Sequence, residues 1–109
     1  MYFVKMINMN IAHIKRGVKM KISELKIGDE ILFLMKDYYN KGQEIYEFGN
    51  IAHIEMDNKL ISVTYLEGYK SRSETIPFNK VIAKGDVENG VVMKFKGVSG
   101  KGVFIEHEN

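Results

Sequence analysis

Five side chains in two polar loops have the chemistry of a ligand-binding site. They are Tyr38, Tyr39, Tyr69, Lys70 and Arg72. A tyrosine ring stacks on flat ligands and its hydroxyl forms hydrogen bonds, while lysine and arginine donate charge-assisted hydrogen bonds to anions. Loops on a rigid scaffold carry a large share of binding residues. The pattern therefore predicts that these five residues bind a partner or a small nucleotide-like ligand.

Three further aromatic residues favour a different role. Tyr46, Phe48 and Tyr65 lie in apolar stretches whose alternation is typical of strands. We expect them to pack in a hydrophobic core.

The sequence carries no pattern typical of catalysis or metal binding. His53 and Glu55 would share one face of a strand, and residues 106–108 offer further ligands, but a metal site needs three or four that converge. The glycine-rich stretch 97–102 is too short for a phosphate loop and precedes a strand instead of a helix, so it predicts a hairpin turn. Cysteine is absent, which excludes disulfides and thiolate chemistry. We expect a protein that is not an enzyme and has no catalytic residue, metal or cofactor.

Short strands must position the two loops. Apolar residues fill every position of 31–35, which predicts a strand buried on both faces. A long strand over 45–56 contains Gly49–Asn50, which predicts a bulge or a sharp bend. Further strands are expected at 60–66, before Pro77, and at 81–83, 91–95 and 103–106, with one helical turn at 78–80. This succession of short strands and turns indicates an all-β fold.

The order of these segments resembles the Tudor-like and KOW-like small β-barrels. The resemblance covers about residues 25–84 and lies in Leu25-Lys-Ile-Gly-Asp-Glu-Ile31, Gly49-Asn-Ile-Ala-His-Ile54, Ile61-Ser-Val-Thr-Tyr65, Glu74-Thr-Ile-Pro77 and Val81-Ile82. It implies a five-stranded, Src-homology-3-like barrel that binds nucleic acid, modified peptides or protein partners. The chain has no tryptophan and no recognisable cage signature, so no functional residue is carried over from the family. A C-terminal hairpin over 86–107 lies outside the resemblance, and its apolar run 91–93 favours a symmetric homodimer.

Charge divides the chain into a leader, residues 1–19, and a single domain, residues 20–109. The leader holds four of the 16 basic residues and no acidic one, which leaves 12 basic against 14 acidic residues in the domain. Without excess positive charge, the domain alone is a poor match for nucleic acid.

Two interpretations of the leader stay open. Apolar residues recur at helical spacing up to Val18, with Gly17 as a C-cap, which predicts an N-terminal helix. Alternatively, codons for 15–19 would resemble a bacterial ribosome-binding site before Met20, which would then be the true start. The sequence Asn10–Ile14 recurs unchanged as Asn50–Ile54, and a true repeat would make the leader a coding segment that forms a strand.

These observations predict a non-catalytic binding module. Lysine outnumbers arginine 14 to 2, a bias of AT-rich codons that suggests a phage or mobile element of a low-GC bacterium. The expected partner is a host protein or a small nucleotide-like ligand, without membrane contact, in the cytoplasm. The alternative is an RNA- or DNA-binding small barrel that uses the basic leader.

Overall fold

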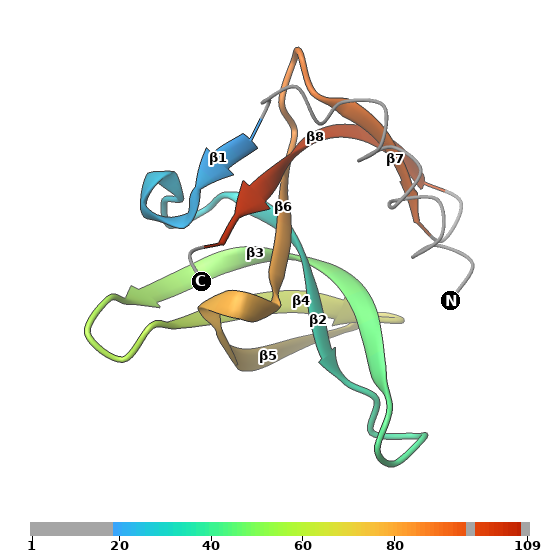
Figure 1. Ribbon diagram of the computed structural model, residues 1–109. Coiled ribbons are helices and arrows are strands. Elements are labelled where there is room, and N and C mark those ends of the chain that lie inside the picture. The colour runs from blue at the N-terminus through green and yellow to red at the C-terminus, as the bar shows by residue number, and fades with distance from the viewer. Residues whose placement is uncertain (1–18, 96–97, 108–109) are drawn as a thin grey trace.

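The structure, a computed structural model, describes residues 19–95 and 98–107, and within them it is built from strands (Figure 1). Two single-turn 3₁₀-helices interrupt the strands, and none of the described residues lies in an α-helix. The elements are β1 (Lys19–Lys21), η1 (Ile22–Glu24), β2 (Glu30–Lys36), β3 (Glu44–Glu55), β4 (Leu60–Glu67), β5 (Lys70–Pro77), η2 (Phe78–Lys80), β6 (Val81–Gly85), β7 (Val91–Phe95) and β8 (Val98–Glu106). The predicted all-β class is confirmed.

The strands form one continuous sheet in the order β1-β8-β6-β2-β3-β4-β5, and β7 pairs with β8. Neighbouring strands run antiparallel except for β1, which pairs with β8 in parallel. The antiparallel pairing of β7 with β8 agrees with the hairpin expected over 86–107.

The sheet differs from the predicted five-stranded barrel. It is an open sheet of eight strands, because β8 pairs with the free edge of β6 and extends the sheet to β1 and β7. At the other end, no described strand pairs with the outer edge of β5. The five strands that the barrel required are nevertheless neighbours, in the order β6-β2-β3-β4-β5.

The predicted N-terminal helix falls within residues 1–18, which lie outside the described part of the chain. Lys19, the last residue of the predicted leader, begins strand β1 and pairs with Phe104. The first copy of the repeated pentapeptide is also outside the described residues, and the second copy lies in β3.

Strand β2 separates two hydrophobic clusters, as its uniformly apolar sequence predicted. Ile31, Leu32 and Phe33 are fully buried. Ile31 and Phe33 face the larger cluster with the apolar side chains of β4, while Leu32 faces a smaller cluster with Ala83 and Phe104. Successive side chains of a strand point to opposite faces, so an all-apolar strand is stable only between two apolar layers.

The bend expected at Gly49–Asn50 takes a different form. The pairing of β3 with β2 runs without interruption through Gly49, and the register shift with β4 lies further on, between Ile51 and His53. Gly49 instead permits close packing: a Cβ there would lie 2.5 Å from the Thr64 carbonyl oxygen and 3.0 Å from the Phe33 ring. A glycine is therefore needed at position 49 because β4 leaves no room for a side chain there, and not because the strand forms a bulge.

Candidate binding site

The β2–β3 loop presents two tyrosines from a framework organised by Asp37. The Asp37 carboxylate accepts hydrogen bonds from the Asn40 side chain at 2.8 Å and from the Tyr39 backbone amide at 2.9 Å. These two bonds hold the pKa of the Asp37 carboxyl below its ordinary value. The Asp37 amide in turn donates to the Gln43 carbonyl at 3.0 Å. An aspartate that bonds its own loop in this way fixes the turn, and here it fixes the positions of Tyr38 and Tyr39.

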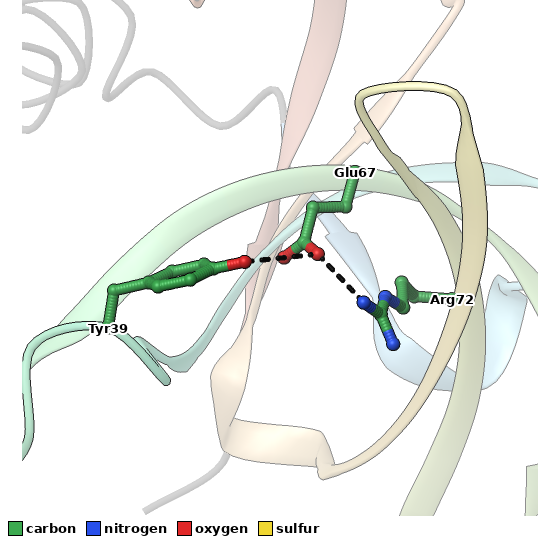
Figure 2. Close-up of polar contacts among 3 residues, drawn as sticks. All are labelled: Tyr39, Glu67 and Arg72. Atoms are coloured by element: carbon green, nitrogen blue, oxygen red, sulfur yellow. Dashed lines mark hydrogen bonds and ion pairs between the residues drawn. The ribbon is translucent and has the colours of Figure 1, made fainter.

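The two tyrosine hydroxyls reach across to the β4–β5 hairpin. The Tyr38 hydroxyl lies 2.8 and 2.9 Å from the two carboxylate oxygens of Glu74. The Tyr39 hydroxyl donates to Glu67 at 3.4 Å, and the Arg72 guanidinium forms an ion pair with the same carboxylate at 3.1 Å. Figure 2 shows Tyr39 and Arg72 approaching Glu67 from opposite sides. The loop is thus tied to the hairpin by two acidic residues.

The hairpin places these charged groups on the face that carries the core. Tyr65 pairs with Arg72, and Val63 pairs with Glu74. Residues directly opposite in an antiparallel pair point to the same face, and Val63 and Tyr65 are buried. Glu67, two residues beyond Tyr65, follows on that face. The charged side chains therefore begin where the core ends.

Together these side chains line a hollow of about 380 Å³, which we call the tyrosine pocket. Its lining residues are Tyr38, Tyr39, Tyr65, Glu67, Arg72, Ser73 and Glu74. Tyr38 and Tyr39 keep 64% and 80% of their surfaces exposed, so both rings remain accessible to a ligand. The pocket thus combines accessible aromatic surface with two carboxylates and one guanidinium.

The electrostatics of the pocket are set by its carboxylates. The hydrogen bond to Glu74 raises the pKa of the Tyr38 hydroxyl, because it favours the neutral donor and the adjacent negative charge opposes ionisation. Burial raises the pKa of Tyr65, and the charges of Glu74 and Glu67 raise it further. Glu67 is partly neutralised by Arg72, whereas Glu74 has no ion pair with any described residue. The net charge of the lining is therefore negative.

The structure brings together three of the five predicted binding residues, Tyr38, Tyr39 and Arg72. Tyr69 is fully exposed at the β4–β5 turn, and the exposed Lys70 does not line the pocket. Of the three aromatic residues expected in the core, Tyr65 is buried, while Tyr46 and Phe48 are half-buried against the smaller cluster.

The sequence interpretation missed Glu67 and Glu74, which form the acidic part of the pocket. The available signal was their spacing of two residues from the buried apolar residues of β4 and β5, which places them on the same face. Ile61, Val63, Tyr65 and Glu67 fall on one face of β4, so a charged residue there continues an inward-facing series.

Among the described residues, no three histidine or acidic side chains converge as metal ligands, and none of the elements is a helix of membrane-spanning length and apolarity. The chain matches no protein-family model, no curated protein and no solved structure.

Proposed function

We propose that this protein is a non-catalytic binding module whose tyrosine pocket recognises a cationic side chain of a protein partner. The observation that carries the proposal is the pairing of exposed tyrosines with two carboxylates opposed by a single guanidinium. A tyrosine ring attracts ammonium and guanidinium groups through its electron-rich face, by about 0.5–2 kcal/mol. Carboxylates at the same place add an attraction of the same sign.

The charge of the pocket distinguishes this ligand from a nucleotide. Glu67 and Glu74 would repel a phosphate, and the guanidinium of Arg72 is already engaged by Glu67. A lysine or arginine of a partner would instead meet Glu74, whose charge no described cation neutralises. The same reasoning disfavours nucleic acid at this pocket, since the domain has no excess of basic residues.

The strand order supports a resemblance to small binding barrels. Strands β6-β2-β3-β4-β5 are consecutive in the sheet, and the single 3₁₀ turn η2 precedes β6. This is the order that the Tudor-like or KOW-like pattern implies for five strands. Under this proposal β1, β7 and β8 are an extension of that unit.

Titration of the ¹⁵N-labelled protein followed by NMR tests the ligand class. Two probes are compared, N-acetylarginine methylamide as the cation and adenosine monophosphate as the nucleotide. We expect the cation to shift the amide signals of residues 38–39 and 67–74, and to do so less at high salt because screening weakens charge attraction. Shifts in these segments with the nucleotide alone would refute the proposal.

Three variants sharpen the test. Glu74→Gln removes the carboxylate without changing its size and should weaken cation binding, while Glu88→Gln makes the same change at an exposed residue outside the pocket and should not. Arg72→Met removes the competing guanidinium and should strengthen cation binding. If Arg72 were instead the anion-binding group, this variant would abolish nucleotide binding and leave the cation unaffected.

A further inference from the structure

A second hollow, which we call the η2 groove, lies at the end of the molecule opposite the tyrosine pocket. Figure 1 shows β1 and the β3–β4 turn on one side and the β2–β3 loop on the other. The groove has a volume of about 680 Å³, within the range of roughly 300–1,000 Å³ that is typical of ligand sites. Its apolar lining comes from Ile22, Met56, Pro77 and Phe78, and two lysines, Lys21 and Lys59, border it.

The walls of the η2 groove are held by hydrogen bonds between elements. The Phe78 amide donates to the Lys59 carbonyl at 2.9 Å, which fastens η2 to the β3–β4 turn. The Lys59 amide donates to the Met56 carbonyl at 3.2 Å and closes that turn. On the other side, His107 Nε2 lies 2.6 Å from the Val81 carbonyl oxygen. A groove fixed in this way is already formed before a ligand binds, which lowers the entropic cost of binding.

The groove is apolar in its centre and positively charged at its border. Met56 keeps 55% of its surface exposed, and its flexible thioether adapts to different apolar partners. Lys21 and Lys59 are exposed and form no ion pair with any described residue. Glu106 is the single carboxylate among the described lining residues, so the cations prevail.

We propose that the η2 groove binds an acidic, extended segment of a partner protein. An apolar side chain of the segment lies against Met56 and Phe78, and flanking carboxylates meet Lys21 and Lys59. Burial of the apolar side chain supplies most of the affinity, while the lysines select for negative charge. This site is independent of the tyrosine pocket, which selects the opposite charge.

Tryptophan fluorescence provides a direct test, because the chain itself contains no tryptophan. The probe is an acetylated pentapeptide in which glutamate alternates with tryptophan and leucine. Binding to the full-length protein should shift the tryptophan emission to shorter wavelength as the indole leaves water. A peptide with glutamine in place of glutamate should bind at least about 5-fold more weakly, since it lacks the charges that meet the lysines.

Charge-reversal variants locate the binding. Lys21→Glu and Lys59→Glu should each weaken binding of the acidic peptide at least about 5-fold. Lys94→Glu makes the same change on β7, outside the groove, and should leave the affinity unchanged. Glu74→Gln in the tyrosine pocket should also leave it unchanged, so this inference can fail while the proposed function stands.

Three results would overturn the inference. The first is no shift of the peptide's emission at a protein concentration of about 1 mM, which corresponds to negligible affinity. The second is equal loss of binding in Lys94→Glu and in the two groove variants. The third is a dimer in sedimentation velocity that Met56→Glu dissociates, which would assign the groove to a second copy of this chain.

Discussion

Replacing Gly49 with alanine tests the close packing that holds β3 against β4. The added Cβ would lie 2.5 Å from the Thr64 carbonyl oxygen, well inside the contact distance, and 3.0 Å from the Phe33 ring. Neither neighbour yields easily, because one is backbone and the other is a fully buried ring in edge contact with Tyr65, at a centroid distance of 6.2 Å. Overpacking of this kind costs about 1–3 kcal/mol. Loss of glycine entropy in the unfolded chain returns about 0.4–1 kcal/mol.

We therefore expect Gly49→Ala to lower the free energy of unfolding by about 1 kcal/mol net, measured by urea denaturation. For a domain of about this size that corresponds to a fall in Tm of about 4–8 °C. Gly100→Ala is the matched control, since a Cβ there meets no atom within 4 Å. Equal stability of the two variants, within about 0.5 kcal/mol, would refute the packing argument.

Three further predictions concern ionisation. Ultraviolet titration should give Tyr38 a pKa above 10.0, and Glu74→Gln should return it toward that value; no change would contradict the hydrogen bond. The free energy of unfolding should decrease as pH rises above about 10, because the raised pKa values of Tyr38, Tyr46 and Tyr65 make the folded state hold these protons more tightly, and this contribution should be fully present below that pH. Conversely, the lowered pKa of Asp37 stabilises the protein above pH 3.8 and this contribution is lost as pH falls, so Asp37→Asn should flatten the acid limb of the stability curve.

Much of the fold was predictable because local patterns reflect local burial. The all-apolar run in β2 has two buried faces, and Pro77 with the following helical turn ends β5. The open sheet was not predictable in the same way. Its extension depends on pairing Lys19–Lys21 with Phe104–Glu106, which are far apart in sequence and carry no shared turn signal. Pairing between such distant segments produces no hydrophobic periodicity in either sequence from which it could be predicted.

The candidate site was predicted in part. Loop position and residue type drew attention to Tyr38, Tyr39 and Arg72, which the fold brings to one pocket. Of the two partners expected from the sequence, the proposal keeps a protein partner and sets the nucleotide-like ligand aside, because the acidic residues beside the tyrosines give the pocket a negative charge. Glu67 and Glu74 meet the two tyrosines because the β2–β3 loop reaches the β4–β5 hairpin. The contacting residues are 28 and 36 positions apart in the sequence, and no local pattern specifies contacts at that separation.

The two carboxylates at core-facing positions are the physical reason for proposing a cationic ligand. A carboxylate on an inward face is costly unless it keeps water or gains a partner. Among the described residues, Glu67 is bound by Arg72 and Tyr39, whereas Glu74 is bound by the neutral hydroxyl of Tyr38 and by no cation. The Glu74 carboxylate therefore lies beside exposed aromatic surface. A cation that binds there supplies the missing partner, while an anion would add repulsion to the cost of removing water. The same pocket cannot satisfy both ligands, and the response of Glu74→Gln separates them.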